Sequence, residues 1–192
     1  MAVLGQAPVD HLGSPDDASL VQDRVCEPLG LRDTVVVPDA SQAERLARGH
    51  GRRNRPIEPW HLLGLAGAGA LRSTAGDLLA YLRAHLRPDD RPLAEALVLT
   101  QHERHRSRPV GGMALAWMRG PGPSGPLLLH GGATGGFRAF AAFAPEAGLG
   151  VVALSNSTRS PDRAAIIPLR DLLRAGSTWA GHLPDPLERT RP

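Results

Sequence analysis

Apolar positions follow two different patterns along the chain, and the pattern changes near residue 110. Before that point apolar side chains recur at intervals of three and four residues, which is typical of helices with one buried face. After it they form short continuous runs separated by glycine- and proline-containing turns, which favours antiparallel strands. The pattern predicts helices at 14–30, 74–88 and 93–100, then apolar runs at 113–118, 127–130, 137–143 and 149–155.

The first helix carries start and stop signals. Ser14 is predicted as its N-cap, with Pro15 at the first helical position and Asp17 three residues after the cap. Gly30 is expected to follow its last turn. Residues 1–13 show no period, so we expect an irregular lead-in before the helix.

The second helix begins at a predicted capping box formed by Thr74 and Asp77, and Pro88 should end it. Between the two helices, residues 31–60 are polar and rich in turn-forming residues, so we expect a loop with one helical turn near 42–46. The side chains that share one face of the second helix are Leu78, Leu82, His85 and Leu86.

A closing helix over 161–175 follows the strands, and its sheet-facing side chains are predicted to be Ile166, Leu169, Leu172 and Leu173. Helices separated from an antiparallel strand meander indicate an α+β fold. The predicted organisation is one partial domain over 1–176, with a helical part at about 14–105, a sheet part at about 110–157, the closing helix, and a loose tail at 177–192.

Composition excludes several classes of function. All 22 basic residues are arginine and the net charge is only +3, so the pI of 10.3 reflects arginine usage. Two clusters, at 52–55 and 104–108, lack aromatic residues and any nucleic-acid-binding motif, so they are interpreted as solvated loops. No stretch approaches the ~20 apolar residues that cross a bilayer, and no signal peptide is recognised. The sequence therefore predicts a cytoplasmic protein without nucleic-acid or membrane partners.

Metal, cofactor and disulfide chemistry are not predicted either. The single cysteine, Cys26, excludes an internal disulfide and is expected to be a buried structural thiol. His102, Glu103 and His105 resemble a zinc motif only superficially, because the histidines are three residues apart and arginines follow them. We interpret this segment as a charged loop.

A serine nucleophile is not evident from local motifs. No G-x-S-x-G elbow occurs, and Ser124 lies in a glycine- and proline-rich turn. A hidden Ser-His-Asp set remains open, because such sets are defined by geometry and the chain has eight histidines. The hydroxyls considered for it are Ser155, Ser157 and Ser160. Of the tryptophans, Trp117 is expected in the sheet core, and Trp60 and Trp179 in other packing.

Four segments, in this order, resemble the serine β-lactamase-related family of class C β-lactamases, D-alanyl-D-alanine carboxypeptidases and esterases. They are VCEPLGLRDT at 25–34, AGAGALRSTAGDLLAYL at 66–82, LHGGATGGF at 129–137 and PEAGLGVVALSN at 145–156. The resemblance implies that the chain corresponds to the C-terminal part of a β-lactamase/transpeptidase-like fold.

This family transfers acyl groups through a serine, which it activates with S-x-x-K and Y-x-N motifs. The sequence contains no lysine, and its only tyrosine, Tyr81, is followed by Leu82 and Arg83. In complete relatives both motifs precede the segment at 25–34, and only 24 residues precede Val25. The resemblance therefore implies a missing N-terminal portion and a chain that is inactive alone.

The segment at 129–137 resembles the family's K-T-G strand, which forms one wall of the substrate cleft. By this resemblance, His130 offers a hydrogen bond or positive charge to a substrate carboxylate, and Ala133 supplies an oxyanion-binding N–H. The wall predicted in this way comprises His130, Gly131, Gly132, Ala133 and Thr134.

The resemblance also implies an open sheet edge, because the N-terminal strands of complete relatives pair with this sheet. An open edge invites self-association or a partner chain. Three functions stay open: a truncated or split acyl-transfer hydrolase, a non-catalytic module that binds a small acyl or amide ligand, and a degenerate remnant without activity.

Overall fold

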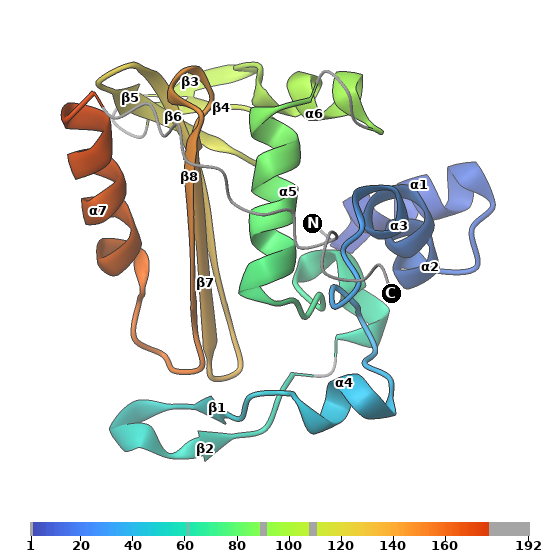
Figure 1. Ribbon diagram of the computed structural model, residues 1–192. Helices are drawn as coiled ribbons and strands as arrows, with labels where there is room; N and C mark the ends of the chain where they lie inside the picture. Colours follow the sequence, from blue (N-terminus) through green and yellow to red (C-terminus); the bar gives the residue numbers. More distant parts are fainter. Residues whose placement is uncertain (1, 61, 89–91, 108–110, 177–192) are drawn as a thin grey trace, which may run out of the picture.

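A six-stranded antiparallel sheet forms the centre of the molecule, with α5 against one face and α7 against the other (Figure 1). The N-terminal helices lie beyond α5, on the side away from the sheet (Figure 1). The computed structural model describes residues 2–60, 62–88, 92–107 and 111–176. This arrangement confirms the α+β class.

Short helices and one small hairpin make up the first half of the chain. They are α1 (Ala2–Leu12), α2 (Asp17–Val21), the π-helical turn η1 (Gln22–Cys26), α3 (Glu27–Leu29), α4 (Ala40–Glu44), β1 (Gly49–His50), η2 (Arg52–Asn54), β2 (Pro56–Ile57), η3 (Leu63–Ala68), α5 (Ala75–Leu86) and α6 (Ala94–Gln101). The sheet and its covering helix follow: β3 (His105–Ser107), β4 (Gly111–Met113), β5 (Met118–Gly122), β6 (Gly125–Thr134), β7 (Phe137–Ala144), η4 (Pro145–Ala147), β8 (Leu149–Ser155) and α7 (Asp162–Arg174).

The expected irregular lead-in is wrong, because α1 occupies it. A tertiary contact explains the helix: Val9 is buried, and α1 packs against η3. The two backbones approach closely at glycines, since a Cβ on Gly5 would lie 3.1 Å from the Cα of Gly67. A partner more than 50 residues away leaves no periodic signal in the first thirteen residues.

The start of the first predicted helix is displaced by two residues. Asp16, and not Ser14, is the N-cap of α2, and its carboxylate accepts a 2.7 Å hydrogen bond from the backbone N–H of Ser19. This bond lowers the pKa of Asp16. The predicted end is confirmed, because Gly30 adopts the left-handed conformation after α3, at φ +68°.

The start of the second predicted helix is confirmed in part. The Thr74 hydroxyl caps α5 by accepting from the backbone N–H of Asp77 at 3.2 Å. The Asp77 carboxylate instead accepts from the Asp33 N–H and the Thr34 hydroxyl, both at 2.8 Å. It therefore ties the loop after α3 to the helix that covers the sheet.

The strand meander is confirmed, since each strand pairs with its sequence neighbour in the order β3-β4-β5-β6-β7-β8. Two buried clusters flank this sheet. The cluster on the α5 face contains Leu82, Ala114, Trp117, Leu128 and Phe143. The cluster on the α7 face contains Leu127, Phe140, Ala142, Ala144, Leu149, Ala165, Leu169 and Leu173.

Three local predictions need correction. The apolar run at 113–118 is a turn between β4 and β5, with Ala116 at φ +64°. Leu172 is 46% exposed, because the stripe that α7 buries runs through Ala165, Leu169 and Leu173. The region 31–60 holds the β1–β2 hairpin besides loop, whereas its predicted helical turn near 42–46 corresponds to α4. Trp117 is buried as expected, and Trp60, though 57% exposed, packs outside the core against the β6–β7 turn. The tail at 177–192, with Trp179, lies outside the described residues.

Removing the Asp77 carboxylate should destabilise the fold. Asp77→Ala would leave the Asp33 N–H and the Thr34 hydroxyl without this acceptor, so we expect a loss of about 3 kcal/mol in the free energy of unfolding. Urea denaturation measures it. Asp171→Ala is the matched control, because that carboxylate is 65% exposed and should change stability by less than about 0.5 kcal/mol. Equal losses in both variants would contradict the role of Asp77.

Gly136 should be the glycine of the β6–β7 turn that tolerates no side chain. It has φ +80°, and a Cβ there would lie 2.8 Å from the backbone of Gly49 and His50. We expect Gly136→Ala to cost about 2 kcal/mol or more. Gly132→Ala is the control, because nothing lies within 4 Å of its added Cβ. Thermal denaturation measures the loss of stability in both variants. Equal losses would show that the effect comes from replacing any glycine of this segment and not from a clash at Gly136.

Candidate functional site

The last five residues of β6 form a strand edge that is free on one side. β7 pairs with this segment from His130, opposite Ala141, to Thr134, opposite Phe137. On the other side, pairing with β5 stops at Leu129, opposite Met118. Among the described residues, 130–134 therefore have a neighbour on one edge only. Alternate residues of a strand direct N–H and C=O groups to each edge, so this segment can pair with an extended ligand.

The predicted wall residues are brought together on this segment, and they are accessible. His130, Gly131, Gly132 and Ala133 are exposed, and Thr134 is half-buried. Leu128 belongs to the cluster on the α5 face, so strand alternation places the side chains of His130 and Thr134 on that face. Ala133 points to the opposite face. Within the described residues, the His130 ring makes no hydrogen bond to another residue and is free to contact a ligand.

The far end of the wall is held by backbone contacts. The His50 N–H donates to the Gly136 carbonyl at 3.2 Å, which joins β1 to the β6–β7 turn. A Cβ on Gly135 would lie 2.8 Å from the Trp60 ring, so the indole rests on this turn. A Cβ on Gly69 would lie 3.5 Å from Thr134 Cγ2, so the segment after η3 flanks the wall.

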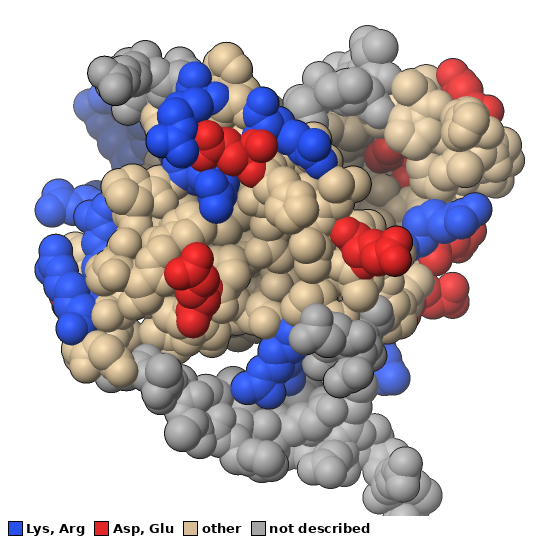
Figure 2. Space-filling view, turned by 90° about the horizontal axis from the view of Figure 1, so that it is seen from above, with Lys and Arg blue, Asp and Glu red and all other residues tan. Residues whose placement is uncertain are grey.

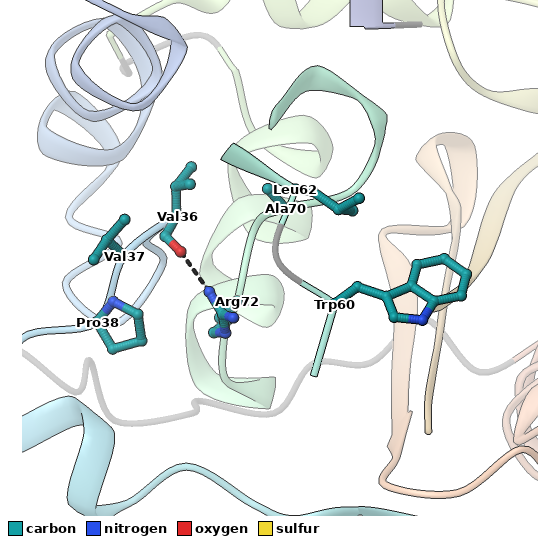
Figure 3. Close-up of a pocket in the computed structure, with 7 residues that line it drawn as sticks. All are labelled: Val36, Val37, Pro38, Trp60, Leu62, Ala70 and Arg72. Carbon is teal, nitrogen blue, oxygen red and sulfur yellow. Dashed lines mark hydrogen bonds between the residues drawn. The ribbon is translucent and has the colours of Figure 1, made fainter. Parts of the chain in front are cut away.

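A shallow pocket of about 200 Å³ lies beside this end of the wall (Figure 3). Its lining residues are Val36, Val37, Pro38, Trp60, Leu62, Ala70 and Arg72. Arg72 is the one charged residue of the lining, and its guanidinium donates to the Val36 carbonyl at 2.5 Å. The indole of Trp60 points away from Val36 and Val37 (Figure 3). The pocket is thus apolar with one cationic group.

Sequence reasoning did not find this pocket. Its two sides, at 36–38 and 70–72, are joined by paired backbone hydrogen bonds between Val35 and Arg72, at 2.9 and 2.8 Å. The segment 66–82 was recognised as a motif, but the sequence holds no signal that connects it to 36–38.

The serines considered for a hidden catalytic set do not meet a histidine. Ser155 and Ser157 lie 3.1 Å apart through their hydroxyls at the end of β8, and Ser160 accepts from the Asp162 N–H. The His50 ring lies nearby, but its Nδ1 is 3.2 Å from the Asn156 carbonyl. In residues 2–60, 62–88, 92–107 and 111–176, no serine hydroxyl is hydrogen-bonded to a histidine ring.

In the segment with His102 and His105, Glu103 forms ion pairs with two arginines. Glu103 bonds Arg106 at 2.8 Å and Arg119 at 3.1 Å, and both arginines lower the pKa of its carboxyl. The predicted charged loop is confirmed for His102 and Glu103. It is wrong for His105, which begins the short edge strand β3. Acidic and basic side chains are interspersed on this end of the molecule (Figure 2). The described residues contain no group of three or more metal-ligating side chains.

Cys26 is buried, and Tyr81 is half-buried against the α5-side cluster. Cys26 is 1% exposed, as predicted, and burial raises the pKa of its thiol. Tyr81 packs edge-on against His85 within the α5-side cluster, and burial raises the pKa of its phenol. Among the described residues, no helix has the length and apolar character that would let it cross a membrane.

A family model and a curated relative both relate this chain to β-lactamases. The Beta-lactamase family model matches residues 13–182. A β-lactamase of Pseudomonas fluorescens is 25% identical over 191 residues, which covers 81% of this chain and 52% of that protein. The chain therefore spans about half the length of this curated relative.

Solved structures show the same fold at lower identity. A class C β-lactamase superposes with a TM-score of 0.80 at 20% identity, covering 95% of this chain and 56% of the other. The β-lactamase/D-alanine carboxypeptidase of Pseudomonas syringae gives a TM-score of 0.80 at 21% identity, covering 91% and 57%. The strand order, the free wall of β6 and the family model that matches residues 13–182 lead to one conclusion: the chain belongs to the β-lactamase family.

Proposed function

We propose that this chain provides the substrate-facing wall of an acyl-transfer serine hydrolase and does not turn over substrate by itself. The observation that supports this proposal is the free edge at 130–134, where pairing with β5 ends one residue before His130. The edge is exposed and its far end is fixed by the contact between β1 and the β6–β7 turn. A rigid, accessible edge suits an enzyme that must hold an acyl group in one orientation.

The wall would act through its backbone and through one side chain. An extended acyl or amide ligand would lie along the edge and exchange hydrogen bonds with alternate residues. The Ala133 N–H would then donate to the oxygen on which negative charge develops, which stabilises the transition state more than the ground state. The His130 imidazole would donate a hydrogen bond, or present a positive charge, to a carboxylate of the ligand.

The nucleophile must come from outside the described wall. An S-x-x-K pair needs a lysine, and the sequence has none. Tyr81, the only tyrosine, packs against His85 beside the α5-side cluster, and Arg83 stands where a Y-x-N motif needs asparagine. The relatives are nearly twice as long as the stretch that this chain matches. We therefore assign the serine and its base to a further polypeptide segment, joined to this one or supplied by a partner chain.

The exposed edge of β8 is the proposed place for such a partner or for a second copy. Among the described residues, β8 pairs only with β7, and Leu154 on it is 42% exposed. An unpaired strand edge readily accepts another strand. Sedimentation velocity should therefore detect a dimer, or a complex with the completing segment, and Leu154→Lys should weaken it. A single monomeric species at all concentrations, for the chain and with the added segment, would contradict this proposal.

The purified chain should neither hydrolyse nitrocefin and p-nitrophenyl acetate nor be labelled by a fluorophosphonate. The physical reason is the lack of a serine paired with a base in the described residues. Turnover is followed by absorbance, and labelling by mass spectrometry. Turnover that His130→Ala abolishes, together with one labelled serine, would show that the chain contains its own nucleophile.

A ligand-binding module without turnover is the second candidate, because the wall is intact although the S-x-x-K motif is absent. Nitrocefin should then bind without being cleaved, and His130→Ala should weaken binding about tenfold if a charge-assisted hydrogen bond is lost. Titration calorimetry measures the affinity. His105→Ala, an exposed histidine on β3, is the control and should leave the affinity unchanged. If the unmodified chain does not bind nitrocefin, this second candidate is wrong.

A further inference from the structure

His85 is a fully buried histidine whose polar atoms are only partly satisfied. Its residue is 1% exposed, although it lies in the last turn of α5. Three aromatic rings surround it, and their centroids lie 4.7 Å (Tyr81), 5.4 Å (Trp117) and 5.1 Å (Phe143) from that of the imidazole. Nε2 is buried and has no hydrogen-bond partner among the described residues. Such a group is costly to bury, so it requires an explanation.

Gln101, the last residue of α6, determines the proton position on this ring. Its side-chain N–H₂ group donates to the His85 carbonyl at 3.0 Å and lies 3.3 Å from the ring Nδ1. The carbonyl can only accept, so the amide nitrogen must face His85. Nδ1 is then the acceptor and the neutral ring carries its proton on Nε2. A second proton on Nδ1 would place a donor against a donor and break the contact between α6 and the ring.

The groups packed around the ring provide no compensating charge. α6 presents Gln101, the β4–β5 turn presents Trp117, and β7 presents Phe143, none of which titrates in acid. Tyr81 of α5 is neutral there because burial raises the pKa of its phenol. In the neighbouring segment, Glu103 is paired with both Arg106 and Arg119. The other charged groups closest to His85 and Gln101 in the sequence, Arg83, Arg87 and Arg104, are all cationic and would oppose a second positive charge.

We propose that the His85–Gln101 contact is an acid-sensitive latch that holds α6 and the β4–β5 turn against α5. Protonation of the ring ejects it from the aromatic cluster and releases these two elements. The consequence reaches the wall, because β5 pairs with β6 as far as Leu129, the residue before His130. Acid therefore loosens the strand pairing next to the wall. This inference is independent of the ligand proposed for the wall and concerns its regulation.

The direction of the pH effect follows from burial. Burial lowers the pKa of His85 from 6.5 to about 4 in the latched form. The released form takes up its proton near pH 6.5, so between about pH 6.5 and 4 each pH unit favours release about tenfold. Above pH 6.5 both forms hold a neutral ring and pH has no effect through this group.

Fluorescence of Trp117 tests the latch, in the full chain with Trp60→Phe and Trp179→Phe. We expect a reversible change in Trp117 emission between pH 6.5 and 4 that His85→Phe removes from this window. His105→Phe, which alters an exposed histidine, is the control and should keep the change. An unmodified chain without a change in this window, or a His85→Phe variant that retains it, would overturn the proposal.

A second measurement does not depend on the folding of the His85→Phe variant. Long-range ¹H–¹⁵N spectra of the unmodified chain report the tautomer and the titration of each histidine. We expect His85 to carry its proton on Nε2 in the latched form and to take up a second proton only as the Trp117 emission changes. A proton on Nδ1 at neutral pH, or titration of His85 near 6.5 in the folded chain, would exclude the latch.

Discussion

The Asp77 carboxylate is the interaction on which the arrangement of the helical half depends. It sits in the first turn of α5, the helix that covers the sheet, and accepts from the Asp33 N–H and the Thr34 hydroxyl. Val35, the residue after Thr34, pairs through its backbone with Arg72, which lies five residues before Asp77. These bonds bring the segment after η3 to a fixed position, where Gly69 lies against Thr134. The half-buried Asp77 carboxylate at the start of α5 thereby helps to fix the position of the helical half relative to the wall.

Local chemistry explains which parts of this fold the sequence could predict. The threonine cap of α5, the glycine after α3 and the β6–β7–β8 meander are encoded by residues a few positions apart, and the structure has them as predicted. α1 was missed because its stability comes from η3, more than 50 residues away. Asp77 was predicted only as a local capping partner, and its carboxylate instead serves residues 43 and 44 positions upstream.

The sequence likewise predicts one part of the candidate site and gives no signal for the other. His130 to Thr134 could be predicted as a wall because they form one continuous segment that resembles a family motif, and they lie on one strand. The pocket with Arg72 was not found, because three separate segments build it and no local pattern connects 36–38 with 70–72. His85 was predicted on the buried face of its helix and is indeed buried. Its lack of a charged partner could not be read from the sequence, because that depends on what α6, the β4–β5 turn and β7 bring to it.

The β1–β2 hairpin is short, but it helps to hold the end of the wall in place. Its base, at Gly49 and His50, is packed directly on the glycines of the β6–β7 turn. Its tip, at Arg53 and Asn54, is exposed, and both residues adopt positive φ values that bulky side chains avoid. The base therefore limits how far the end of the wall can move, whereas the exposed tip lies in solvent.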